Sequence, residues 1–234
     1  MKLAIMQPYL FPYIGYFQLI NAVDEFIVYD NIQYTKKGWI NRNRILVNGT
    51  DAYITIPLKK DSDFLDIQAR KLSGDWEIEK EKILNRIKES YRKAPQFSRV
   101  FPVIEKVLLF EEKNLFQFIF NSLIEINSYL EIKTPLVLSS TISIDHHLKS
   151  EKKVMALCKA RNATTYINPI GGIELYNKQE FKYQGLDLHF LKANNINYPQ
   201  FNNEFVPFLS IIDVMMFNSK ESITEYLNTG FSMH

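Results

Sequence analysis

The chain has 234 residues, of which 46% are hydrophobic and 23% are charged, and its formal net charge is +2. This length allows one α/β domain with a full core, or two small domains, and the composition is ordinary for a soluble globular protein. The small net charge does not imply long-range attraction to nucleic acid or acidic lipid, although a local basic patch remains compatible with it.

The composition also bears on the compartment. Cys158 is the one cysteine, so no intramolecular disulfide can form, and we expect a buried thiol in a reducing compartment. Gln7, Pro8 and Pro12 interrupt the apolar N-terminus, which lacks the features of a signal peptide. No stretch reaches the roughly 18 apolar residues that a membrane-spanning helix needs. We therefore expect a cytoplasmic protein without a transmembrane segment.

The first 30 residues predict a βαβ unit. The stretch "LAIMQ" (3–7) is typical of a buried strand, residues 16–23 have helical spacing, and "DEFIVYD" (24–30) is typical of a second strand. The two prolines in the connection after the first strand prevent regular structure there. A strand, a helix and a strand within about 30 residues have the size of one crossover, so the two strands should be parallel.

The middle of the chain has a different pattern. Residues 42–58 predict a hairpin, because the Asn-Gly pair within them suits a tight turn, and "DIQARKL" (66–72) has the pattern of a short strand. An amphipathic helix is predicted from Trp76 to about Ser90, followed by a short helix and by a largely buried helix at 114–132. The buried face of the amphipathic helix should comprise Trp76, Ile78, Ile83, Ile87 and Tyr91.

The α/β pattern then resumes. It predicts a strand at 134–141, a helix at 148–162, a strand and loop at 163–176, a short helix and strand at 177–194, and one or two helices at 206–228. The expected fold class is α/β, a Rossmann-like three-layer arrangement with a mainly parallel sheet, a β-hairpin and a helical insertion. We expect a single domain over 1–234, with the helical stretch at about 76–132 inserted between its two α/β parts; two domains are the alternative.

Two polar, aromatic segments follow the first two predicted strands. The first contributes Gln7, Tyr9, Tyr13, Gly15 and Tyr16, and the second contributes Asp30, Gln33, Tyr34, Lys36, Lys37, Trp39, Asn41, Arg42, Asn43 and Arg44. Ligands of open α/β sheets bind at the carboxyl ends of the strands, so both segments are well placed for a site. Arginine offers a planar fork of donors to carboxylate or phosphate, and the aromatic rings could stack on a sugar or base. The alternatives are tyrosines packed under the sheet and a solvated basic loop or nucleic-acid patch.

Other polar groups are weaker candidates. The adjacent His146 and His147 cannot both face one site, and one of them could act as a base or cap a helix. No further ligand stands at a recognisable metal spacing from this pair. Ser210 and Asp213 share one face of an apolar helix, where they either help to build a site or anchor the helix to a loop.

The opening "QPYLFPYIGYFQLINAVDEFIVYDNIQYTKKGWINRNRI" resembles that of the WbqC-like protein family. The resemblance extends through "ITIPL", "YRKAPQF", "LCKARNATTYINPIGG" and "YPQFNNEFVPFLSIIDVMMFN", and so covers nearly the whole chain. The positions that match the family pattern are Gln7, Pro8, Gly15, Tyr16, Asp30, Gln33, Tyr34, Trp39, Asn41, Arg42, Asn43 and Arg44, with Gln200, Ser210 and Asp213 in the late motif. The two adjacent histidines are not part of that pattern. The order strand, Pro-containing loop, helix, strand is also similar to the opening of nucleotidyltransferase folds, but their His-x-Gly-His signature is absent.

The resemblance implies a role in bacterial surface-polysaccharide (lipopolysaccharide, O-antigen) biosynthesis. We expect a transferase that moves an acyl or aminoacyl group to the amine of a nucleotide-linked amino sugar; the alternative is a non-catalytic nucleotide-sugar or glycan-binding accessory protein. Asp30 and His146 are the catalytic candidates, and the substrate-binding candidates are Gln7, Tyr9, Tyr13, Gly15, Tyr16, Gln33, Tyr34, Lys36, Trp39, Asn41, Arg42, Asn43, Arg44 and Gln200. The expected partner is a nucleotide-linked sugar or other small-molecule substrate, with no nucleic acid, and the sequence names no cofactor, donor or oligomeric state.

Overall fold

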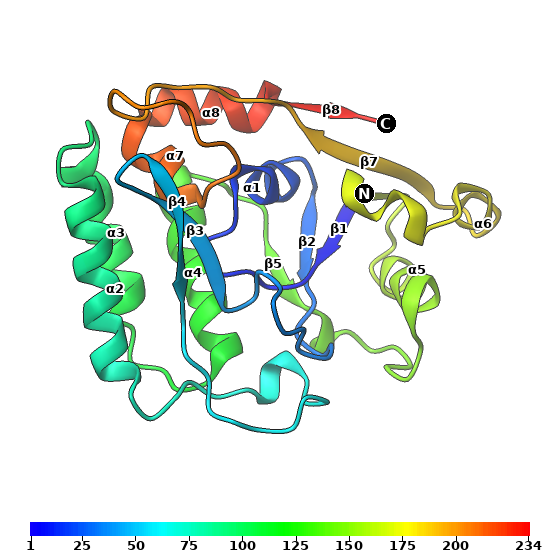
Figure 1. Ribbon diagram of the computed structural model, residues 1–234. Helices are drawn as coiled ribbons and strands as arrows, with labels where there is room; N and C mark the ends of the chain where they lie inside the picture. Colours follow the sequence, from blue (N-terminus) through cyan, green and yellow to red (C-terminus); the bar gives the residue numbers. More distant parts are fainter.

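A computed structural model describes residues 1–234, and its centre is a six-stranded sheet in the order β5-β2-β1-β6-β7-β8 (Figure 1). The strands are β1 (Lys2–Met6), β2 (Glu25–Val28), β5 (Leu136–Leu138), β6 (Thr165–Pro169), β7 (Asp187–Ala193) and β8 (Phe231–Met233). Every neighbouring pair is parallel except β7 and β8. The predicted α/β class with a mainly parallel sheet is therefore confirmed. The sequence did not predict β8, because its three residues are too few to form a pattern.

The helices cover both faces of the sheet, so the molecule has three layers with the sheet in the middle (Figure 1). Along a strand, successive side chains point to opposite faces. Leu3 and Ile5 accordingly belong to a core cluster of 14 buried residues on the side of α5 (Ser150–Ala160) and α6 (Lys178–Tyr183). Ala4 lies in the larger cluster of 48 buried residues on the other side. Cys158 is buried in the smaller cluster as expected, and burial raises its pKa to about 12.

The larger cluster joins the sheet to six helices. These are α1 (Ile14–Asn21), α2 (Trp76–Tyr91), α3 (Phe97–Leu108), α4 (Leu115–Leu130), α7 (Ile211–Phe217) and α8 (Lys220–Thr229). Helix α1 connects the parallel strands β1 and β2, which confirms the predicted βαβ unit. Helices α2 to α4 form the predicted helical stretch, and they stand at the left of Figure 1.

The predicted hairpin is a separate two-stranded sheet of β3 (Arg42–Val47) and β4 (Thr50–Thr55). Its turn residues Asn48 and Gly49 have φ values of 51° and 80°, the left-handed conformation that a tight hairpin turn requires. The hairpin lies beside α2 in Figure 1, and the Leu46 amide donates to the Tyr91 hydroxyl at 2.8 Å. This bond ties the hairpin to the end of α2.

Two local predictions were wrong. Ile78 is 62% exposed, because it stands two residues after the buried Trp76 and so lies on the opposite side of α2. Residues 66–72 form no strand: Ile67–Ala69 is a 3₁₀ turn, and the neighbouring residues make only isolated bridges. Two further 3₁₀ turns, Ser139–Thr141 and Ile170–Leu175, follow β5 and β6.

Candidate functional site

The segments that follow β1 and β2 meet, as the sequence predicted. The Leu10 amide donates to the carbonyl oxygens of Trp39 and Ile40 at 3.2 and 3.1 Å. The buried Asn43 amide donates to the carbonyls of Leu10 and Phe11, both at 2.9 Å. One asparagine at the start of the hairpin therefore holds the proline-rich loop against it.

A third segment, which follows β7, closes on the same place. The Ser210 hydroxyl donates to the Phe11 carbonyl at 2.8 Å, and its amide donates to the Arg44 carbonyl at 2.9 Å. The next residue, Ile211, donates its amide to the Pro12 carbonyl at 2.9 Å. These bonds place the end of the segment that follows β7 beside both other segments.

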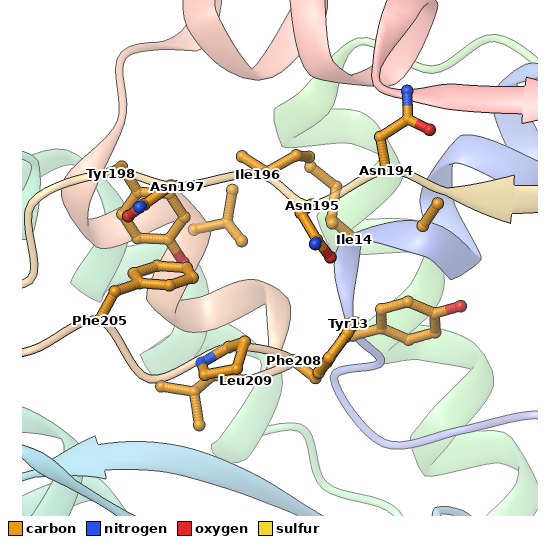
Figure 2. A pocket seen from close by; sticks show the side chains of 13 residues that line it. Tyr13, Ile14, Asn194, Asn195, Ile196, Asn197, Tyr198, Phe205, Phe208 and Leu209 are labelled. Atoms are coloured by element: carbon orange, nitrogen blue, oxygen red, sulfur yellow. The ribbon is translucent and has the colours of Figure 1, made fainter.

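The three segments line two adjoining cavities that are open to solvent. The larger one, shown in Figure 2, has a volume of about 360 Å³, and the smaller one has about 190 Å³. Tyr13 and Phe208 line both cavities, so they stand where the two join. The larger cavity is lined by Tyr13, Ile14, Ala193, Asn194, Asn195, Ile196, Asn197, Tyr198, Phe205, Pro207, Phe208, Leu209 and Val214. The smaller is lined by Tyr9, Pro12, Tyr13, Trp39, Asn43, Arg44 and Phe208.

The larger cavity offers apolar rings and neutral amides. Asn195 and Asn197 are exposed, and neither side chain makes a hydrogen bond to another part of the protein. In Figure 2 the Asn195 amide points toward the side where Tyr13 and Phe208 lie, whereas that of Asn194 points away from them. Aromatic faces with a few amide donors and acceptors suit an uncharged, hydroxyl-rich ligand.

The smaller cavity holds Arg44, which is the only charged side chain lining either cavity. Its Nη1 lies 3.2 Å from the Asp51 carboxylate, and its Nη2 donates to the Phe208 carbonyl at 3.3 Å. Its guanidinium lies over the Trp39 ring, 5.7 Å from the ring centre, and its buried Nε has no acceptor. A guanidinium with unused donors beside an exposed aromatic ring is suited to bind an anionic group.

Tyr9 and Tyr13 complete this wall with neutral hydroxyl groups. Burial raises the pKa of both phenols, and for Tyr9 the neighbouring Tyr13 adds to the effect. Both stay protonated at neutral pH and can donate a hydrogen bond. Gly15 makes room for Tyr13, since a Cβ at position 15 would lie 2.4 Å from the Tyr13 ring.

Several predicted binding residues lie in the framework instead of the cavities. Tyr16 is buried, and its hydroxyl donates to the Gln7 carbonyl at 2.9 Å. Tyr34 is also buried and donates to the Asn41 side-chain oxygen at 2.8 Å. The Arg42 guanidinium donates to the Gly38 and Lys37 carbonyls, and so braces the loop before the hairpin.

The remaining predicted binding residues also have partners elsewhere. Gln33 and Lys36 are exposed, and they bond to the carbonyl and carboxylate of Asp63, respectively. Gln200 is buried, accepts from the Val206 amide at 2.7 Å and donates to Asp213 at 2.7 Å. Gln7 directly follows β1 and is not among the residues that line the cavities.

The structure does not bring the two catalytic candidates to the cavities. Asp30 is buried, and its carboxylate accepts from the Ser139 hydroxyl at 2.7 Å and from the amide and hydroxyl of Ser140 at 2.9 and 2.5 Å. His146 places Nδ1 2.8 Å from the Asn31 amide nitrogen and Nε2 3.0 Å from the Ile142 carbonyl. A neutral ring with its proton on Nε2 satisfies both contacts.

Residues that sequence reasoning missed come from the segment after β7. Asn195, Asn197, Phe205 and Phe208 line the larger cavity, yet none was selected from the sequence. The available signal was a stretch rich in asparagine, proline and phenylalanine directly after the last parallel strand, where ligands of such sheets bind.

The fold and the cleft define a class, namely an α/β protein with a mainly parallel sheet and a small-molecule-sized cleft beside it. The chain belongs to the WbqC-like protein family, whose family model matches residues 7–225. It is 30% identical over 232 residues to the uncharacterized protein Rv1507c of Mycobacterium tuberculosis, and the match covers 97% of each chain. No solved structure matches the chain. The resemblance noted in the sequence is thus confirmed.

Two further findings concern membranes and metals. None of the helices is both long enough and apolar enough to cross a bilayer. No three side chains of His, Cys, Asp or Glu gather closely enough to hold a metal ion.

Proposed function

We propose that the protein binds a nucleotide-linked amino sugar in the two adjoining cavities and transfers an acyl or aminoacyl group to the sugar amine, as a step in bacterial surface-polysaccharide biosynthesis. The observation that carries this proposal is the position of Arg44. It is the only charged side chain in a cleft that otherwise presents aromatic rings and amides. Membership of the WbqC-like protein family supports the pathway context.

The division of the cleft matches the parts of such a ligand. A diphosphate suits the Arg44 guanidinium, whose Nη1 and Nη2 atoms reach their present acceptors only at 3.2 and 3.3 Å. The neighbouring Trp39 is 39% exposed and offers a face for stacking. The neutral cavity with Asn195 and Asn197 suits sugar hydroxyls or an amide.

In the proposed transfer the sugar amine attacks the acyl carbonyl, a C–N bond forms, the bond to the donor's leaving group breaks, and the amine loses a proton. Asp30 and His146 line neither cavity, so holding the two reactants in one orientation is the contribution that this cleft offers. The leaving group departs with the electron pair of the broken bond and takes up the proton that the amine loses.

A second candidate function is non-catalytic binding of a nucleotide sugar. It is favoured by the absence of a nucleophile–base pair among the residues that line the cavities. Incubation with UDP-glucosamine, in which the sugar amine is free, and a panel of acyl donors separates the two functions. A new amide, detected by mass spectrometry, supports transfer, whereas binding without any product supports the accessory role.

The binding step is tested with Arg44→Gln and isothermal titration of UDP-N-acetylglucosamine. We expect the dissociation constant to rise at least about tenfold, because one hydrogen bond to a charged group contributes about 1.5–3 kcal/mol. The melting temperature should fall by only about 2–4 °C, because the pair with the exposed Asp51 is weak and the bond to the Phe208 carbonyl contributes about 1 kcal/mol. Arg86→Gln is the matched control: Arg86 also donates to a carbonyl, that of Tyr53, but lines neither cavity. Equal affinity of the wild type and Arg44→Gln would contradict the proposal.

A further inference from the structure

Phe208 has an unusual backbone for a bulky residue. Its φ is +56°, in the left-handed region that favours glycine, and its side chain is 60% exposed. Strained conformations persist only where the surrounding structure imposes them, and they gather at functional sites. An exposed aromatic ring on a strained backbone therefore needs an explanation beyond folding.

The neighbours of Phe208 impose this conformation. Its carbonyl accepts from Arg44 Nη2 at 3.3 Å, and the following residues Leu209 and Ser210 are both buried. Ser210 is also fixed through its bonds to Phe11 and Arg44. The Phe208 ring is left at the surface, at the junction of the two cavities.

Phe201 has a similar backbone conformation, but its ring is packed against another aromatic ring, whereas the Phe208 ring is not. Phe201 also has a positive φ, of 53°, but its ring packs edge-on against Phe217 with 4.8 Å between ring centres. Phe208 has no aromatic or cationic partner of that kind within the protein. Phe208 instead lines both cavities, as Tyr13 does.

We propose that Phe208 is a specificity-determining residue whose ring stacks on the sugar ring of the bound ligand. This inference rests on the proposed function, because the Arg44 cavity then holds the phosphate and the sugar next to it lies at the junction. A phenyl ring offers no polar hydrogen-bonding atom, so it selects for a sugar whose hydroxyl groups leave one ring face apolar and open for stacking. The strained backbone keeps the platform in place before the ligand arrives.

The test combines stability with binding in Phe208→Gly. Glycine relieves the left-handed strain, so the melting temperature of the ligand-free protein should rise by about 2–4 °C. Loss of the ring should weaken UDP-N-acetylglucosamine at least tenfold in isothermal titration, while free UDP loses less. Phe208→Leu, which keeps an apolar side chain without an aromatic face, should also weaken the sugar nucleotide.

Glu131→Gly is the matched control. Glu131 ends α4 with a φ of 60°, and it is not among the residues that line the cavities. This variant should gain stability similarly and bind with unchanged affinity. A Phe208→Gly protein that is no more stable than the wild type, or that binds equally well, overturns the inference and leaves the proposed function standing.

The wild type is also titrated with coenzyme A and with free N-acetylglucosamine. If it binds one of these but no sugar nucleotide, and Phe208→Gly loses that binding, a ligand-contact role for Phe208 survives and the proposed function fails. If the wild type binds none of the compounds, both are overturned.

Discussion

The residue pair Tyr13 and Gly15 shows how one missing methyl group shapes the cleft. Tyr13 precedes α1 and lines both cavities, and its ring occupies the space that a Cβ at position 15 would need. The clash would involve the far end of the Tyr13 side chain, which can move without disturbing the backbone. Gly15 is thus needed for the position of the ring and not for the helix.

We therefore expect Gly15→Ala to change binding without lowering stability. Alanine within a helix is favoured over glycine by up to about 1 kcal/mol, so the melting temperature should stay level or rise. The displaced ring should weaken binding of UDP-N-acetylglucosamine several-fold. Thermal melts and titrations of Gly15→Ala and of Tyr13→Ala check this. An unchanged affinity in both variants would remove Tyr13 from the site.

Arg42 and Arg44 show where residue-level prediction from the sequence ends. Both lie on β3 in the same basic segment, and no sequence pattern distinguishes them. In the structure Arg42 braces the Gly38 and Lys37 carbonyls, whereas Arg44 faces the smaller cavity. Which of the two arginines faces the cavity depends on the path of the loop at residues 36–41, and the sequence of this loop has no periodic pattern from which its path could be predicted.

At the scale of the element, α7 is held by one buried carboxylate. Asp213 accepts from the hydroxyls of Tyr91 and Tyr198 at 2.9 and 2.7 Å and from the Gln200 amide at 2.7 Å. The helix is thereby connected to the end of α2 and to the segment that lines the larger cavity. Of the two roles that the sequence left open for Asp213, the contacts are those of an anchor.

The anchor should make stability depend on pH. Burial raises the pKa of Asp213, and the three hydrogen bonds oppose this only in part. The folded protein therefore favours the protonated carboxyl relative to the unfolded chain, whose aspartate titrates near pH 4. The resulting stability is fully present below that pH and is lost as the pH rises through the folded-state pKa.

Comparison with Asp213→Asn isolates this effect, because all other titrating groups are shared. The free energy of unfolding of the wild type minus that of Asp213→Asn should fall as the pH rises from about 4 and level off above the folded-state pKa. Urea denaturation at several pH values measures this difference. A difference that stays constant with pH would show that the Asp213 pKa is the same in both states.

The elements themselves were predictable to different degrees. The βαβ unit and the hairpin were readable because apolar spacing and an Asn-Gly turn are local signals. The sequence could not predict that residues 194–209 line a cavity. Their position depends on the bond from Ser210 to Phe11, which lies almost 200 residues away along the chain. The choice of wall residues thus needed the tertiary structure.

At the scale of the whole molecule, the cleft unites parts of the chain that lie far apart in sequence. Its walls come from residues 9–14, 39–44 and 193–214, and the larger core cluster lies beneath all three. That cluster contains Ala4 and Phe26 of the sheet and also Ile83 and Phe118 of the helical stretch. We therefore expect the helices α2 to α4 to unfold together with the sheet.

The shared core predicts that the protein unfolds in one transition and that a ligand of the cleft shifts it as a whole. At a ligand concentration 100 times the dissociation constant, binding adds about 2.7 kcal/mol to the free energy of unfolding. For a chain of this size, that corresponds to a rise in melting temperature of about 5–10 °C. Differential scanning calorimetry with and without UDP-N-acetylglucosamine measures both features. Two separate transitions, with the ligand raising only one, would mean that the helices at 76–132 form a domain of their own.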